Sequence, residues 1–209
     1  MEYNEKQKQI LVTAEQLFST KGFDGTSVRD IADAAGVNIA MISYYFGSKE
    51  KLMEALFEQR TTNIKVKVES LLKDDSTTPF QKVEILAEDI INKIMSKKQF
   101  FKIMMCEQVI NKNPVVMNLM YDLKKKNLEE FGKIITDGQQ KGVFKKDIDF
   151  LLLYNMLVGS ISQMMITIDQ YREYNNLTNI PEEQVYEQIK KKLSENIKVL
   201  FKALLSYEA

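Results

Sequence analysis

The side chains best suited to contact a nucleic acid are gathered between Thr26 and Lys51, where hydroxyl, amide, phenol and charged groups recur at short spacing. Such groups donate hydrogen bonds to phosphate oxygens, and some of them also read base edges in the major groove of DNA. No paired-carboxylate, glycine-rich phosphate or nucleophile motif accompanies them, and the chain has no histidine. The residues therefore favour binding over catalysis, and we expect no catalytic residue, no metal ligand and no cofactor.

Two short helices joined by a tight turn are predicted to position these side chains. Thr26 and Ser27 are both good N-caps for the first, and Asp30 lies three residues after Ser27, as in a capping box. This helix places Val28, Ile31 and Ala32 on one face at helical spacing. Gly36 then supplies the backbone freedom that a sharp helix end requires.

The second helix is predicted to begin after Asn38, to bury Ile42 and Phe46, and to end before Gly47. Helix, short turn, helix is the shape of a helix-turn-helix DNA reader. A plain helical hairpin has the same spacing, so geometry alone leaves both interpretations open.

A recognition helix directs its N-terminal residues towards base edges. The positions that this rule assigns to bases are Asn38, Ile39, Ala40 and Met41, with Ser43 and Tyr44 further along. A phenol or an ammonium group can donate to a phosphate without reading the base sequence. The residues that carry such groups here are Tyr44, Tyr45 and Lys49. The N-terminal N–H groups of the preceding helix also favour a phosphate, which adds Thr26, Ser27 and Arg29.

The blocks Gly22–Ala32, Ala35–Val37 and Tyr44–Leu52 resemble the N-terminal domain of the TetR family of bacterial transcriptional regulators, colinearly over roughly the first 60 residues. The rest of the chain resembles that family only in length, helicity and arrangement. The resemblance implies that the matching positions make the DNA contacts named above. Many relatives have a basic residue at position 39, glycine at 40 and an aromatic residue at 43, so the operator sequence does not follow from this chain.

The resemblance also implies the architecture and activity. We expect an all-α protein with a three-helix helix-turn-helix DNA-binding domain at 1–48 and a helical regulatory and dimerisation domain at 49–209. Its partners would be a double-stranded, pseudo-palindromic DNA operator and a second copy of the chain, with a small apolar ligand releasing a homodimeric repressor. A helix-turn-helix protein without an inducer, an activator and a carboxylate-based helical enzyme remain alternatives.

Composition narrows the class of protein. Lys and Arg number 29 and so do Asp and Glu, which argues against a wholly basic nucleic-acid coat and requires any DNA contact to come from local charge. A hydrophobic fraction of 44% is enough for packed cores. The single cysteine, Cys106, the polar N-terminus and the apolar run Phe150–Ile161, too short to span a bilayer, predict a cytoplasmic protein without membrane contact.

Apolar periodicity predicts helices throughout and no strand. Beyond the reading helices, they are expected at 5–20, 49–72, 80–95, 98–110, 114–140, 150–175 and 182–206. The resemblance makes the last two the dimer interface, as a four-helix bundle, with the alternative that their stripes close the monomer's own core. The predicted interface residues are Leu153, Leu157, Ser160, Ile161, Met164, Ile189, Leu193, Ile197, Leu200 and Leu204.

The C-terminal region is rich in methionine, whose flexible thioether suits a pocket for bulky apolar compounds. A methionine stripe at helical spacing is also ordinary core, so both interpretations stand. The predicted pocket residues are Phe100, Phe101, Met104, Met105, Tyr121, Asn155, Met156 and Gln163.

Overall fold

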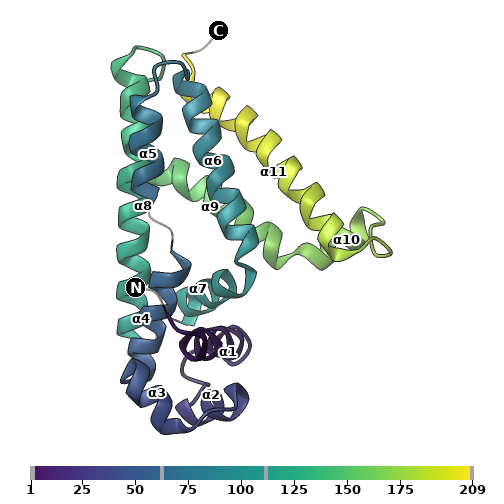
Figure 1. The fold of residues 1–209 in the computed structure, drawn as a ribbon. Helices are drawn as coiled ribbons and strands as arrows, with labels where there is room; N and C mark the ends of the chain where they lie inside the picture. The colour runs from purple at the N-terminus through teal and green to yellow at the C-terminus, as the bar shows by residue number, and fades with distance from the viewer. Residues whose placement is uncertain (1–2, 62–63, 111–112, 208–209) are drawn as a thin grey trace. The chain divides into compact units, whose positions relative to one another are not determined.

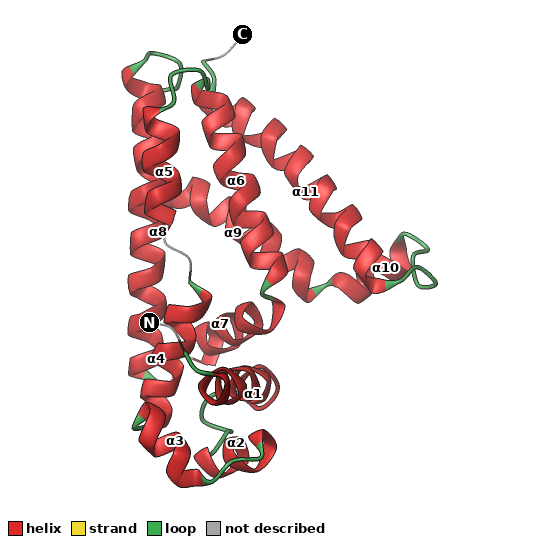
Figure 2. Cartoon of the chain, in the orientation of Figure 1, coloured by secondary structure: helices red, strands yellow, loops and turns green. Residues whose placement is uncertain are grey.

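A computed structural model describes residues 3–61, 64–110 and 113–207, and throughout these residues the chain is helical with no strand (Figure 2). The prediction of an all-α protein is confirmed. The helices, labelled in Figure 1, are α1 (Glu5–Lys21), α2 (Val28–Ala35), α3 (Ile39–Phe46), α4 (Lys49–Arg60), α5 (Ile64–Lys73), α6 (Pro79–Ser96), α7 (Lys98–Ile110), α8 (Pro114–Gln140), α9 (Phe150–Ile166), α10 (Ile168–Tyr174) and α11 (Glu182–Leu205).

The chain divides into two compact units, one formed by residues 1–62 with 97–124 and the other by 63–96 with 125–209. Helix α8 contributes Val116 and Met120 to the first core, and Phe131 and Ile134 to the second. These units do not coincide with the predicted domains at 1–48 and 49–209, because α4, α7 and the start of α8 share a core with α1–α3. The functional division after residue 48 stays a prediction.

The core of the first unit is built on the apolar stripe of α1, which packs against α2, α4 and α7. Phe18 and Phe23 lie with ring centres 5.3 Å apart, and Phe57 of α4 meets Phe100 of α7 edge to face at 4.9 Å. Helix α7 is therefore part of the same packed body as the two short helices (Figure 1).

The second unit packs α6 against α11 and α9. Phe131 is central to its core, with ring centres 6.1 Å from both Tyr154 of α9 and Phe201 of α11. The apolar stripes predicted for the last two long helices supply much of this core. Most of their residues therefore pack within the monomer and are not free for a dimer interface.

Two predicted helices are divided in the structure. The predicted helix 49–72 is α4 and α5, with residues 62 and 63 between them outside the described part of the chain. The predicted helix 150–175 is α9 and α10, which meet at Thr167 with a bend of 72°. The Thr167 hydroxyl donates to the Gln163 carbonyl at 2.8 Å, a local bond that bends helices. No single helix of the described residues has the length and apolarity to cross a membrane, although the bent pair α9–α10 has both together.

Candidate nucleic-acid interface

Helix α2 begins with a reciprocal cap. The Ser27 hydroxyl accepts from the Asp30 N–H at 3.0 Å, and Asp30 Oδ2 accepts from the Ser27 N–H at 2.8 Å and from its hydroxyl at 2.6 Å. The Ser27 bonds hold the pKa of Asp30 below its ordinary value of 3.8. This cap fixes where the first turn of α2 starts, with Arg29 exposed beside it.

The turn between α2 and α3 is closed by backbone geometry and one long-range bond. Gly36 ends α2 in the left-handed conformation with φ +60°, which is costly for other residues. The Gln9 side chain of α1 donates to the Ala35 carbonyl at 2.9 Å, and Asn38 accepts from the Ala40 N–H at 2.9 Å. The prediction of a glycine turn and an Asn38 cap is confirmed.

One face of α3 is buried and the other is open. Ile42 and Phe46 belong to the core of the first unit, as predicted. On the other face Tyr44 is 84% exposed and Ile39 is 44% exposed. The remaining positions predicted to meet DNA on α3 or at its cap are exposed or half-buried: Asn38, Ala40, Met41, Ser43 and Tyr45.

The two tyrosines of α3 differ. Tyr44 reaches solvent, whereas Tyr45 is half-buried and packs against the core, with its ring 5.2 Å from that of Tyr44 and 6.5 Å from that of Phe46. Tyr44 therefore has the freer phenol of the two for a phosphate contact, which stays a prediction for both.

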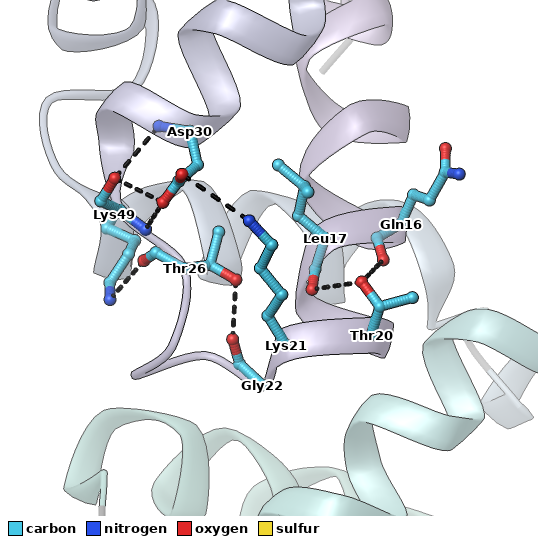
Figure 3. A network of polar contacts seen from close by, with 9 residues as sticks. Gln16, Leu17, Thr20, Lys21, Gly22, Thr26, Asp30 and Lys49 are labelled. Carbon is cyan, nitrogen blue, oxygen red and sulfur yellow. Dashed lines mark hydrogen bonds and ion pairs between the residues drawn. The ribbon is translucent and has the colours of Figure 1, made fainter.

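Hydrogen bonds from the Thr26 hydroxyl and from Lys49 hold the segment before α2 (Figure 3). Thr26 is 1% exposed and its hydroxyl donates to the Gly22 carbonyl at 2.8 Å. Lys49 Nζ donates to the carbonyls of Phe23 and Thr26 at 2.8 and 2.9 Å and lies 4.2 Å from the centre of the Phe23 ring. The buried Thr26 side chain is therefore unsuited to the phosphate contact predicted for it. Lys49 has one N–H left to donate to a phosphate.

The residues predicted to line a ligand pocket differ in burial. Phe100 and Met104 pack in the core of the first unit, and Phe101 is buried while Met105 is half-buried on the same helix. Tyr121 is 67% exposed. The other predicted lining residues belong to the second unit and are exposed on α9: Asn155, Met156 and Gln163. A pocket lined by this set stays a prediction.

The second unit instead has an open groove of about 370 Å³ between α6 and α11. Its lining is mostly charged or polar and includes Glu88, Asn92, Lys191 and Lys198. Glu88 accepts from Lys198 at 2.6 Å and from Ser194 at 2.9 Å, which lowers the pKa of its carboxyl. This lining does not match the apolar pocket predicted from the methionines.

Most predicted dimer residues are core residues of the second unit. Those buried within it are Leu153, Leu157, Ile161, Ile189, Leu193 and Ile197. Met164 is half-buried, and Ser160, Leu200 and Leu204 are exposed. The stripes were assigned to the wrong face for the buried residues, because periodicity marks an apolar face without saying what covers it. The exposed apolar residues on the same helices are Leu151, Leu152, Met156, Ile166, Val199, Leu200 and Leu204.

Two buried acidic residues of the first unit were not predicted from the sequence. Glu15 of α1 is 4% exposed and receives Arg60 of α4, whose Nε lies 3.1 and 3.0 Å from its two oxygens. Glu107 of α7 is 3% exposed and accepts from the Phe23 N–H at 2.9 Å. No sequence motif marks these residues. The sequence signal for their burial was an acidic residue on the otherwise apolar face of a helix.

Known families match both parts of the chain. The family described as bacterial regulatory proteins, tetR family, matches residues 10–56, and the tetracyclin repressor-like C-terminal domain matches residues 79–170. Among the described residues, no group of three or more acidic or cysteine side chains is arranged to hold a metal ion.

Two bacterial relatives are about a third identical to this chain over the residues that align with it. The HTH-type transcriptional repressor NicS of Pseudomonas putida is 31% identical over 153 residues, which are 72% of this chain and 71% of NicS. The protein named "Probable HTH-type transcriptional regulator YttP" of Bacillus subtilis is 33% identical over 133 residues, 63% of this chain. That match spans 64% of the length of YttP, less than two thirds of it.

Solved structures share the fold. The ketosteroid transcriptional regulator KstR2 of Mycobacterium tuberculosis has a TM-score of 0.71 at 20% identity, covering 99% of this chain and 98% of that one. The fatty acid degradation regulator FadR of Bacillus halodurans has a TM-score of 0.69 at 19% identity, covering 95% and 97%. At these identities the likeness concerns the fold alone.

Proposed function

The chain belongs to the TetR family of bacterial transcriptional regulators, and from that premise we propose that it is a homodimeric repressor that leaves its operator when a small apolar ligand binds. The observation that carries this proposal is the open face of α3. A capped eight-residue helix whose inner face is core and whose outer face shows Ile39 and Tyr44 to solvent is what a major-groove reader requires.

The open face of α3 divides by chemistry. We assign Ala40 and Met41 to apolar contact with a thymine methyl group, and Ser43 to donation to a base or a phosphate, because these side chains are exposed or half-buried. Asn38 and Ile39 lie at the N-terminal end that enters the groove first. Because none of these side chains is an arginine, direct base recognition rests on short and apolar contacts.

Phosphate contacts would flank this surface. Arg29 and Ser27 lie at the N-terminus of α2, where free N–H groups add their partial positive charge. Tyr44 and Tyr45 supply phenol groups, and Lys49 keeps one free donor. Lys21 lies 3.7 Å from Asp30 and Lys51 lies 2.7 Å from Glu54, so much of the nearby basic charge is already balanced.

Dimerisation is proposed through the open faces of α9 and α11. Leu152 and Met156 recur at helical spacing on α9, and Val199, Leu200 and Leu204 do so on α11. Pairing two copies by a two-fold axis would bury these side chains and place two α3 helices on one duplex. Half-sites of a pseudo-palindromic operator are then about 34–36 Å apart.

A small apolar ligand is proposed from composition and from relatives. Five methionines lie on three successive helices: Met95 on α6, Met104 and Met105 on α7, and Met117 and Met120 on α8. Two proteins of the same fold are named a ketosteroid transcriptional regulator and a fatty acid degradation regulator. Ligand binding would favour a second arrangement of the regulatory helices and so change the separation of the two α3 helices.

Selection from a random duplex library followed by footprinting tests the proposal. The purified chain should enrich a pseudo-palindromic sequence, protect two successive major grooves and sediment as a dimer. Adding long-chain acyl compounds or sterols to the bound complex should weaken binding for the correct ligand class. Failure to enrich any sequence at low salt would contradict DNA recognition. Enrichment that no apolar compound weakens would favour a regulator without a small-molecule inducer.

A further inference from the structure

Two charged side chains hold the segment Gly22–Thr26, which joins α1 to α2. The Phe23 N–H donates to Glu107 Oε1 at 2.9 Å, and the carbonyl of the same residue accepts from Lys49 Nζ at 2.8 Å. Lys49 also donates to the Thr26 carbonyl at 2.9 Å. Phe23 is therefore fixed through its amide from α7 and through its carbonyl from α4.

Glu107 is placed for this bond by the packing of its helix. It is 3% exposed and Phe23 is 1% exposed, so the N–H has no water to replace a lost acceptor. Helix α7 packs against α1 (Figure 1), and Phe100 of α7 meets Phe57 of α4.

The segment that Glu107 holds leads directly into the proposed DNA contacts. Thr26 is followed by Ser27, whose cap sets the first turn of α2 and the position of Arg29. A change in the Phe23 peptide therefore moves the start of α2. It does so without altering the open face of α3 or adding any charge to it.

We infer that Glu107 is a positioning residue for DNA binding, which holds the start of α2 through the Phe23 amide and does not itself touch DNA. This inference rests on the proposed function. It adds α7 to the elements that hold the DNA-reading helices in place.

Three variants of α7 in the full chain test this inference. Glu107→Leu removes the acceptor with little change in size, Glu107→Gln keeps an acceptor oxygen, and Gln108→Ala changes the exposed neighbouring residue as a control. The probe is the duplex that the wild type enriches from a random library. Affinity is measured across a salt series, at a temperature where circular dichroism shows each variant fully folded, beside hydrogen exchange of the Phe23 amide.

Glu107→Leu should bind about tenfold more weakly, with Phe23 exchanging faster, because a buried donor loses its acceptor. The slope of log affinity against log salt should become shallower, by up to about 0.9, because displacing the start of α2 weakens the phosphate contact proposed for Arg29. Glu107→Gln should recover most of the affinity, and Gln108→Ala should match the wild type.

The inference and the proposed function fail differently. Wild-type affinity in a folded Glu107→Leu with a rapidly exchanging Phe23 amide would overturn the inference and leave the proposed function intact. Weaker binding in Glu107→Leu with the salt slope of the wild type would also overturn it, because the loss would then not pass through the phosphate contact of Arg29. Failure of the wild type to enrich any duplex would contradict the proposed function itself.

Discussion

Tyr44 exposes 84% of its side chain on a helix whose other face is core, and the proposed function gives that exposed phenol a phosphate partner. Tyr44→Phe keeps the ring and removes only the hydroxyl. Operator affinity should fall about tenfold, because a hydrogen bond to a charged phosphate is lost. The salt slope should not change, since a phenol is neutral, whereas Arg29→Met should reduce that slope by about 0.9. Fluorescence anisotropy across a salt series measures both, and unchanged affinity in Tyr44→Phe would remove the phenol from the interface.

Ser27 and Asp30 form a cap whose strength can be measured by titration. Ser27→Ala removes the hydroxyl bonds and leaves the backbone bond, so the pKa of Asp30 should rise part of the way back towards 3.8. Loss of the cap should also lower the free energy of unfolding by about 1 kcal/mol at neutral pH.

The sign of the pH dependence follows from the lowered pKa of Asp30 in the folded protein. The ionised carboxylate stabilises the fold above its unfolded pKa of 3.8, and this contribution is lost as the pH falls through the lower folded value. The stability difference between wild type and Ser27→Ala should therefore shrink in strong acid. An NMR titration of the Asp30 carboxyl carbon gives the pKa, and an unchanged pKa in the variant would show that the hydroxyl does not hold it down.

Arg60 and Glu15 join α4 to α1 through a largely buried ion pair. Arg60→Met should lower the free energy of unfolding by about 3 kcal/mol, because it leaves the Glu15 carboxylate buried without its partner. The double variant Glu15→Leu with Arg60→Met should recover most of that loss, since no charge remains buried. Urea unfolding of the single and double variants measures this coupling, and additive losses would contradict it.

Gly159 lies in the middle of α9, and a Cβ built there would meet nothing within 4 Å. Gly159→Ala should stabilise the monomer by about 0.5–1 kcal/mol through helix propensity. It should weaken the dimer if the open face of α9 packs closely against a second copy. Gly138→Ala is the matched control: its Cβ would lie 2.1 Å from the buried Phe144 ring, so this change should destabilise the fold itself.

Thermal unfolding and sedimentation separate these effects. A more stable Gly159→Ala with unchanged dimer affinity would show that α9 does not pack closely against a partner at this residue. A Gly138→Ala variant as stable as the wild type would contradict the close packing of Phe144.

Local structure was predictable wherever a short-range signal fixes it. Ser27, Gly36 and Asn38 act within their own turns, so the caps and the α2–α3 turn follow from residue type. The bond from Glu107 to Phe23 depends on groups brought together by folding, and no local pattern indicates it. Apolar stripes on α9 and α11 were recognised, but what covers each stripe is a tertiary fact, so Leu157 and Ile197 proved to be core.

The proposed function of the whole molecule depends on the open face of α3 being the surface that reads DNA. Ala40→Glu adds one negative charge near the N-terminal end of that exposed face, and Gln59→Glu adds the same charge to an exposed position on α4. The measurement is the affinity of both variants and of the wild type for the duplex that the wild type enriches, at one fixed salt concentration. Ala40→Glu should bind about 100-fold more weakly, because its carboxylate would face the DNA, whereas Gln59→Glu should remain close to the wild type. Equal affinity of Ala40→Glu and wild type, with both folded, would contradict the assignment of α3 as the reading helix.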